Sequence, residues 1–484
     1  MKNTIKHIIY KIIMIISIIL IMIYWFYVNN FKGVTVNQLL FHLQTNLQGT
    51  NTNMLLKYTA ILVIPTIILY LVLTFINKKL LKKWRIGFYV LTLVIMVSGI
   101  VSVNLLTKDL KVNTYLYNLK HSSTIYDDYY VDPQQTTITF PETKRNLVYI
   151  VMESMETTYE SKDVGGMMDV NLIPYLTKMA QENISFSSTD LLNGGLVYEG
   201  TNYTMASLVS QTSGIPFHIP SNYSKYNDGE YLPGVYTLGE VLADNGYNQV
   251  FMCGSDLHFA DRDIYFRDHG NYEEFDYDTA IELNKIPEDY HVFWGYEDAK
   301  LYEYAKEKVL ELAAKDEPFN FTMLTVDTHF EKGYLCDICE EPFDDQYTNV
   351  IYCADDQVNN FINWLKAQDF YDNTTIVIQG DHPSMGSAFF KDVPDSYVRT
   401  PYNVFINSAV TTTNTKNRLF SVIDNYPTTL ASLGATIDGE RLGLGTNLFS
   451  DTPTLMEELG QETFISEIEA HSNFYDDKIL FIND

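Results

Sequence analysis

The sequence predicts an α/β protein, with a mostly parallel β-sheet sandwiched by helices and preceded by three transmembrane helices. Two observations lead to this prediction. Three long apolar segments lie within the first 107 residues, and from residue 146 onward short apolar runs alternate with segments of helical periodicity. Such alternation is typical of a sheet whose parallel strands are joined by helices that cover both of its faces.

The apolar segments at 12–28, 58–77 and 86–107 carry no charged residue. A helix needs about 20 apolar residues to cross the hydrocarbon core of a bilayer, so these lengths predict three spans. Lys and Arg gather between the second and third segments, in NKKLLKKWR at 77–85, which predicts a cytoplasmic loop there. Three crossings then place the chain after residue 107 on the outer face. The first segment could instead be a signal peptide, but two spans follow it and no small-residue cleavage site does.

Charge is divided unevenly along the chain. Residues 1–120 contain 13 Lys and Arg and a single acid, Asp109, for a net charge of +12. The remaining 20 basic and 60 acidic residues give −40, and the whole chain carries −28 at pH 7. An acidic body repels phosphate backbones, so we expect no nucleic-acid partner.

The four cysteines are too few for a disulfide scaffold. Cys336 and Cys339 form a C-x-x-C, for which a local disulfide or two thiols is a simpler interpretation than a redox or metal site, because no second pair follows at zinc spacing. Cys253 and Cys353 lie in apolar runs and are predicted to be core residues.

The outer part divides into three predicted regions. Residues 108–144 are polar and rich in tyrosine, and we interpret them as a juxtamembrane linker. Residues 145–450 form the α/β domain, with strands predicted at 146–153, 247–255, 318–327 and 373–381. Residues 451–484 form an acidic tail to which the sequence assigns no role.

Polar residues follow the predicted strands, at Glu153, Ser255–Asp256, Asp327–His329 and Asp381–His382. In sheets of this kind ligands bind beyond the carboxyl ends of the strands, so we expect these groups to share one edge. Carboxylates mixed with imidazole suit Zn²⁺ or Mn²⁺ better than Mg²⁺.

A nucleophile is available in the segment YEGTNYTMASLVSQTSGIPF at 198–217. Thr201 and Thr204 precede a stretch with helical character, and a helix N-terminus favours an anion. A threonine hydroxyl next to a metal ion would be an activated nucleophile for phosphorus.

At these residues the chain resembles the lipoteichoic acid synthase and phosphoglycerol transferase family of the sulfatase–alkaline phosphatase superfamily, and most closely its glucan phosphoglycerol transferase subgroup. The resemblance runs from about residue 146 to 449. Its motifs are NLVYIVMESME at 146–156, GTNYTMASLVSQTSGIP at 200–216, GSDLHFADRDIYFRDHG at 254–270, LTVDTHF at 324–330, QGDHPS at 379–384 and RLGLGTNLFS at 441–450.

The resemblance implies a role for particular residues. It implies one divalent metal ion, with Mn²⁺ favoured and Zn²⁺ or Mg²⁺ as alternatives, and Thr204 as the catalytic nucleophile, with Thr201 as the fallback. Arg262 would hold the substrate phosphate and His329 would contact the phosphoglycerol. The implied metal ligands are Glu153, Thr204, Asp381 and His382.

The activity that the resemblance implies is transfer of glycerol phosphate from phosphatidylglycerol to a hydroxyl of an envelope glycan or polymer, through a covalent threonine intermediate. The enzyme would be a multi-pass protein of the cell membrane, with its catalytic domain on the extracellular or periplasmic face. The predicted spans are fewer than in the best-known lipoteichoic acid synthases, and Ala260 stands where those enzymes carry a tryptophan, which leaves the acceptor open.

Three alternatives remain at this stage: a phosphoethanolamine transferase of the same fold, a phosphodiesterase that passes the intermediate to water, and a catalytically inactive glycan-binding protein of the envelope. Sulfate ester hydrolysis is not favoured, because no C/S-x-P-x-R motif surrounds Thr204.

Overall fold

The structure is a computed structural model that describes residues 2–44, 48, 52–79, 85–218, 231–386 and 388–480. The chain divides into two compact units. The first comprises Met1–Val36, Thr50–Tyr117 and Met385–Lys391. The second comprises Asn37–Gly49, Asn118–Ser384 and Asp392–Asp484.

The first unit is built from the long helices α1 (Lys2–Asn30), α3 (Thr52–Lys79) and α4 (Arg85–Asp109). Each contains a segment long and apolar enough to cross a membrane, at Lys11–Asn30, Leu55–Phe75 and Val90–Asp109. This confirms the three predicted apolar helices. Residues 80–84, which carry part of the predicted cytoplasmic loop, lie outside the described residues.

Small residues let two of these helices approach each other. A Cβ atom added at Gly99 of α4 would lie 3.0 Å from the Cα atom of Ser17 on α1. Close backbone approach at small residues is a common way for helices to pack within a membrane. Nearby, Met14, Ile18 and Leu73 form a small buried apolar cluster within this unit.

The second unit is organised around a six-stranded sheet in the order β4-β3-β5-β2-β6-β7. Its first five strands are parallel and β7 is antiparallel to β6. The strands are β2 (Asn146–Met152), β3 (Asn248–Cys253), β4 (Glu273–Phe275), β5 (Phe319–Leu324), β6 (Thr374–Gly380) and β7 (Asn403–Ile406). Every residue of β2, β5, β6 and β7 is buried, as expected for strands that are covered on both faces.

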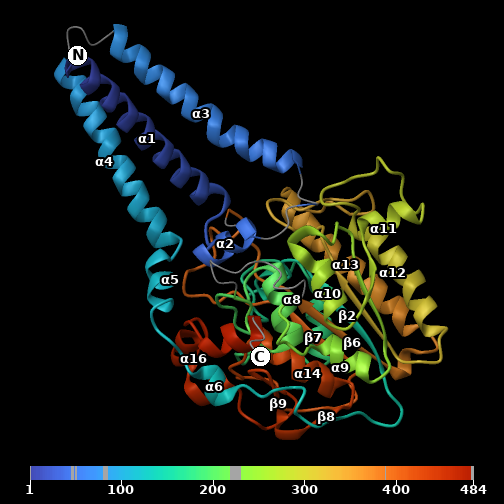
Figure 1. Ribbon diagram of the computed structural model, residues 1–484. Coiled ribbons are helices and arrows are strands. Elements are labelled where there is room, and N and C mark those ends of the chain that lie inside the picture. The colour runs from blue at the N-terminus through green and yellow to red at the C-terminus, as the bar shows by residue number, and fades with distance from the viewer. Residues whose placement is uncertain are drawn as a thin grey trace. The chain divides into compact units, whose positions relative to one another are not determined.

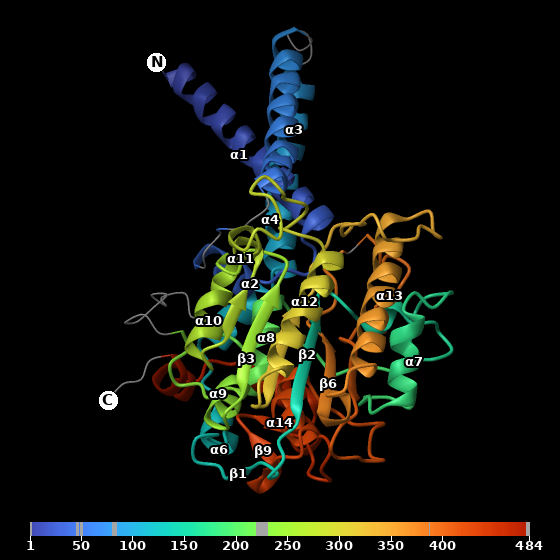
Figure 2. The same ribbon diagram turned by 90° about the vertical axis from the view of Figure 1, so that its right-hand side faces the viewer.

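Helices cover both faces of this sheet. Figures 1 and 2 show α12 (Asp298–Ala313) and α13 (Gln346–Lys366) on one face and α8 (Thr204–Ser213) and α14 (Asn425–Ser432) on the other. The predicted α/β sandwich with a mostly parallel sheet is therefore confirmed. The remaining helices around the sheet are α7 (Pro174–Glu182), α9 (Leu238–Asp244), α10 (Arg262–Asp268) and α11 (Tyr277–Glu282).

The compact unit extends beyond the predicted domain of 145–450 on both sides. Within the predicted linker, β1 (Ile138–Thr139) pairs with β8 (Thr436–Ile437). Within the predicted tail, α15 (Leu455–Leu459) and α16 (Gln461–Ile468) bury apolar side chains, and Arg418 forms an ion pair with Glu457. Acidic composition did not reveal these contacts, because composition does not show which apolar side chains of the tail become buried.

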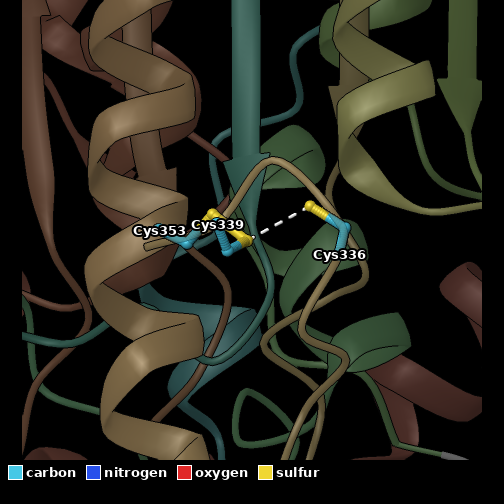
Figure 3. Close-up of side chains that lie close together, drawn as sticks. All are labelled: Cys336, Cys339 and Cys353. Atoms are coloured by element: carbon cyan, nitrogen blue, oxygen red, sulfur yellow. Dashed lines mark hydrogen bonds between the residues drawn. A yellow bond between two sulfur atoms is a disulfide. The ribbon is translucent and has the colours of Figure 1, made fainter. Parts of the chain in front are cut away.

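The cysteines differ from the prediction. Cys339 is bonded to Cys353 on α13, and Cys336 is a free thiol whose Sγ atom lies 3.2 Å from that of Cys339 (Figure 3). The expected local Cys336–Cys339 disulfide is therefore wrong, and so is the alternative of two free thiols, because Cys339 is bonded elsewhere. Cys353 is buried, as predicted for a core residue. The bond joins the loop before α13 to that helix. Cys253 is buried as predicted.

A buried ion pair fixes the segment that follows β2. Glu156 is fully buried, and the Arg399 Nε atom donates to its Oε2 at 2.8 Å while Nη2 donates to its Oε1. The Ser384 amide also donates to Glu156 Oε1, at 3.0 Å. Glu156 therefore connects the chain after β2 with the chain after β6.

Replacing Arg399 by alanine should destabilise the protein by about 3–5 kcal/mol, because it leaves the Glu156 carboxylate buried without its cation. Thermal unfolding of the full chain in detergent measures this effect. Lys162→Ala serves as the control, since it removes an ion pair with Asp169 that lies on the surface. A variant of Arg399 that melts at the same temperature as the control would contradict the prediction.

Candidate active site

The candidate site begins where β2 and β6 end. These neighbouring strands are parallel, and their register pairs Met152 with Gly380. The next residues, Glu153 and Asp381, therefore leave the sheet at the same level and side by side. A side chain at position 380 is excluded, because a Cβ atom there would lie 1.9 Å from the Met155 carbonyl oxygen.

Glu153, Asp381 and His382 form a buried cluster whose donor atoms all lie within 4.8 Å of one another. The His382 Nε2 atom is 3.3 Å from Asp381 Oδ2 and 3.8 Å from Glu153 Oε1. The Asp381 Oδ2 atom is buried and has no hydrogen-bond partner among the described residues. Two carboxylates and one imidazole fit a divalent cation, which would also supply the missing partner of the Asp381 Oδ2 atom.

Neighbouring backbone groups orient the side chains of Asp381 and His382. The backbone amides of Ser154 and His382 both donate to Asp381 Oδ1, each at 2.7 Å. The His382 Nδ1 atom lies 3.0 Å from the Pro383 carbonyl oxygen. A proton on Nδ1 is donated to that carbonyl, which leaves the lone pair of Nε2 facing the two carboxylates.

Thr204 is the first residue of α8 and lies beside the cluster. Its Oγ1 atom is 3.1 Å from Glu153 Oε2 and 3.3 Å from His382 Nε2. The other predicted candidate, Thr201, is fully buried, and its hydroxyl bonds to the backbone of Tyr198 at 2.9 Å. The geometry therefore favours Thr204 over Thr201 as a nucleophile.

Polar side chains attach α8 to the end of β6. The Ser207 hydroxyl donates to the Asp381 carbonyl at 2.6 Å, and the Gln211 amide donates to the Gly380 carbonyl at 3.1 Å. Tyr149 of β2 in turn donates to Gln211 Oε1 at 2.7 Å. Sequence reasoning missed Ser207 and Gln211. Their spacing of three and seven residues from Thr204, which forms a polar stripe on a buried helix, is the signal that could have identified them.

The charges of the cluster perturb one another. Burial, and then repulsion from Glu153, raises the pKa of Asp381 to about 8. Burial also opposes ionisation of Glu153, but His329 and His382 offset it and hold the pKa of Glu153 below its ordinary value. For His382 burial is outweighed by the two carboxylates, so its pKa is raised. Without a cation, the site therefore favours a neutral Asp381 beside an ionised Glu153.

His329 follows β5 and belongs electrostatically to the same site. Burial lowers the pKa of His329, while Glu153 raises it and His382 and Arg262 lower it further. Its Nδ1 atom lies 2.8 Å from the Phe330 carbonyl oxygen. These interactions couple His329 to the metal-ligand candidates, and its role in substrate binding stays a prediction.

Arg262 opens α10 after two residues in the left-handed region, Ala260 with φ 60° and Asp261 with φ 62°. Its buried guanidinium donates to the Phe259 carbonyl at 3.1 Å and to the Asp256 carbonyl at 2.7 Å. None of the hydrogen bonds between described residues joins Arg262 to Thr204. The contact of Arg262 with a phosphate group stays a prediction.

Solved structures share this fold. A protein in the alkaline phosphatase superfamily from Vibrio parahaemolyticus superposes with a TM-score of 0.51 at 19% identity, covering 68% of this chain and 76% of its own. The lipoteichoic acid synthase LtaP from Listeria monocytogenes gives a TM-score of 0.51 at 17% identity, covering 65% and 79%. The expected fold, that of the alkaline phosphatase superfamily, is thus confirmed.

The sequence also assigns the chain to a family within that class of fold. The Sulfatase family model matches residues 145–435, so the chain belongs to the sulfatase family. It is similar to phosphoglycerol transferase I of Escherichia coli O127:H6 (strain E2348/69 / EPEC), with 32% identity over 273 residues, which cover 54% of this chain and 34% of that protein. The chain therefore matches about a third of the length of the curated relatives.

The contribution of Asp381 to the stability of the metal-free protein should fall as the pH rises from about 4 to about 8, because its pKa is about 8 in the folded protein and about 3.9 in an unfolded chain. Over that range the folded state binds more protons than the unfolded state. Asp381→Asn should make the Tm less dependent on pH, since it removes one such group.

Thermal unfolding of the full chain with chelator, at several pH values, measures this effect. The exposed Asp451, replaced by asparagine, is the matched control and should leave the pH dependence as it is. Divalent cation should raise the Tm of the parent protein and have little effect on the Asp381 variant. A pH dependence that Asp381→Asn leaves unchanged would contradict the assigned charge coupling.

Proposed function

We propose that this chain transfers glycerol phosphate from phosphatidylglycerol to a hydroxyl of an envelope glycan or polymer, through a covalent intermediate on Thr204. The observation that carries the proposal is the Thr204 hydroxyl, 3.1 Å from Glu153 and 3.3 Å from His382 at the start of a buried helix. The similarity to phosphoglycerol transferase I supports the choice of the transferred group.

Glu153, Asp381, His382 and Thr204 would hold one divalent cation, with Mn²⁺ favoured and Zn²⁺ or Mg²⁺ as alternatives. When bound, such an ion lowers the pKa of a hydroxyl that it contacts and neutralises charge on a phosphate oxygen.

The chain's own residues perform the remaining tasks. Glu153 Oε2 accepts the hydrogen bond of the Thr204 hydroxyl, and therefore lies where the proton must leave. The Thr204 oxygen forms a bond to phosphorus while the bond from phosphorus to the diacylglycerol oxygen breaks, and diacylglycerol departs with a proton. The N-terminus of α8, which begins at Thr204, would favour the negative charge that develops on phosphate.

The second half of the reaction restores the nucleophile. An acceptor hydroxyl attacks the phosphorus of glycerophospho-threonine, the bond to Thr204 Oγ1 breaks, and that oxygen takes up a proton. Because Ser207 and Gln211 hold α8 against β6, the Thr204 oxygen stays in place through both halves. We assign Arg262 to the phosphate and His329 to the glycerol phosphate group.

We place the catalytic unit on the extracellular or periplasmic face of the cell membrane, because Lys and Arg concentrate in the loop between the second and third spans. The apolar helices anchor the chain in the same bilayer that contains the lipid donor. Anchoring raises the effective concentration of a lipid substrate at the site.

Thr204→Ala should reduce the release of diacylglycerol from phosphatidylglycerol vesicles by about a thousandfold or more, because the covalent pathway loses its nucleophile. Thr204→Ser keeps a hydroxyl and should retain part of the activity. Without acceptor, mass spectrometry of the parent protein should locate a glycerophosphate adduct on Thr204 and not on Thr201.

Two outcomes would contradict the proposal. Unchanged release of diacylglycerol by Thr204→Ala would show that another group attacks phosphorus. Release from phosphatidylethanolamine vesicles but not from phosphatidylglycerol vesicles would show that the transferred group is phosphoethanolamine.

A further inference from the structure

His329 belongs to an aromatic cluster whose other members have no role in the mechanism described above. We define it as His42, Phe259, Phe293, Trp294 and His329. The ring of Trp294 lies 4.9 Å from His329 and 5.3 Å from Phe259, between ring centroids. The Arg262 guanidinium in turn lies 5.7 Å from the centre of the Phe259 ring. Trp294 therefore packs directly on His329 and on the ring that lies beside Arg262.

The backbone around Trp294 is tightly constrained. Val292 and Gly295 exchange two backbone hydrogen bonds, at 2.8 and 2.9 Å, which leaves Phe293 and Trp294 at the tip of a tight turn. Phe293 has a φ of 55°, a strained value for a bulky residue. A Cβ atom at Gly295 would lie 2.1 Å from the Gly254 carbonyl, so the turn is pressed against the end of β3. Strain of this kind is concentrated at functional sites.

The indole of Trp294 has an unused hydrogen-bond donor. The residue is 7% exposed, and its Nε1 atom is buried with no hydrogen-bond partner among the described residues. Buried N–H groups without a partner are rare in native proteins. A tryptophan chosen only for packing could be replaced there by phenylalanine, which has no such donor to bury.

His329 offers the complementary group. Its Nδ1 atom lies 2.8 Å from the Phe330 carbonyl oxygen and donates its proton there. In the neutral ring the Nε2 atom is then a hydrogen-bond acceptor. A donor on Trp294 and an acceptor on His329, on rings in contact, match a hydroxyl group, which both accepts and donates.

The helix α2 (Val36–Gln44) adjoins this cluster. From Asn37 onward it belongs to the second unit, although its sequence lies between the first two predicted spans. The ring of Phe41 packs 4.9 Å from Tyr203, the residue before Thr204, and His42 stacks 6.4 Å from Phe259. The segment before the nucleophile and the cluster around His329 thus contact the same helix.

We propose that Trp294 is a substrate-binding residue that donates its indole N–H to a hydroxyl of the glyceryl headgroup of the lipid donor, opposite His329. This inference rests on the proposed function and names the group that the site selects. We commit to the donor and not to a sugar hydroxyl of the acceptor, because Trp294 packs on His329 and also on Phe259, the ring that lies beside Arg262. His329 and Arg262 are the residues assigned to the transferred glycerol phosphate, so a hydroxyl held by Trp294 and His329 belongs to the group attached to phosphorus.

The test compares two lipids with the full-length protein in detergent and Mn²⁺: phosphatidylglycerol, and phosphatidylethanol, in which an ethyl group replaces the glyceryl headgroup. Trp294→Phe keeps a ring and removes the N–H. We expect its kcat/KM for phosphatidylglycerol to fall about tenfold, the typical effect of one lost hydrogen bond, and its kcat/KM for phosphatidylethanol to stay unchanged. Selectivity between the lipids then falls by the same factor.

The matched control is Trp364→Phe, the same chemical change on α13, where Trp364 stacks on Phe361 at 5.7 Å. This variant should leave kcat/KM unchanged for both lipids. Should Trp294→Phe melt below the parent protein, Trp294→Tyr, which displaces the donor, supplies the same comparison and should lose selectivity as well.

Three outcomes would overturn the inference. Equal losses on both lipids would assign Trp294 a structural role. Unchanged diacylglycerol release combined with a raised KM for the glycan acceptor would assign the hydroxyl to the acceptor. A parent protein that releases no diacylglycerol from phosphatidylglycerol would remove the proposed function itself, which the first two outcomes leave intact.

Discussion

The parallel pairing of β2 with β6 is the constraint on which the site depends. Its register sets Met152 opposite Gly380, so Glu153 and Asp381 emerge together into a buried edge of the sheet. Burial at this edge, and then repulsion from the Glu153 carboxylate, raises the pKa of Asp381. Without a cation the repulsion is relieved by a neutral Asp381, whereas a divalent cation would allow both carboxylates to be ionised.

The position of Thr204 follows from the same pairing. Its helix α8 is buried along its length, yet it carries polar side chains at positions 207 and 211 that bond to the carbonyls at the end of β6. Buried hydrogen bonds have strict geometry and are costly to break, so they hold the first turn of the helix in a fixed place. A slip of one residue in β6 would move the metal ligands and the anchors of the nucleophile at the same time.

Segments remote in the sequence complete the second unit. The helix α2 lies between two predicted spans, the turn at 292–295 precedes α12, and His329 follows β5, yet their rings form one aromatic cluster. The Cys339–Cys353 disulfide ties the loop after His329 to α13. The loop is thus anchored to the layer of helices that covers the sheet. The reactive side chains therefore lie at strand ends and at the start of α8, whereas the groups that hold their surroundings in place come from other parts of the chain.

The sequence by itself determined the features that depend on local signals. Apolar runs marked the three long helices and the buried strands, and polar residues at the strand ends marked Glu153, Asp381 and His382 as neighbours, because parallel strands end at a common edge. The tertiary structure alone decided the features that depend on contacts between distant segments. It placed Thr204 rather than Thr201 beside Glu153, paired Cys339 with Cys353, folded the acidic tail into the second unit and left the Trp294 N–H without a partner beside His329. Periodicity and composition report which residues become buried, whereas the partner that each one meets is set by packing across the whole unit.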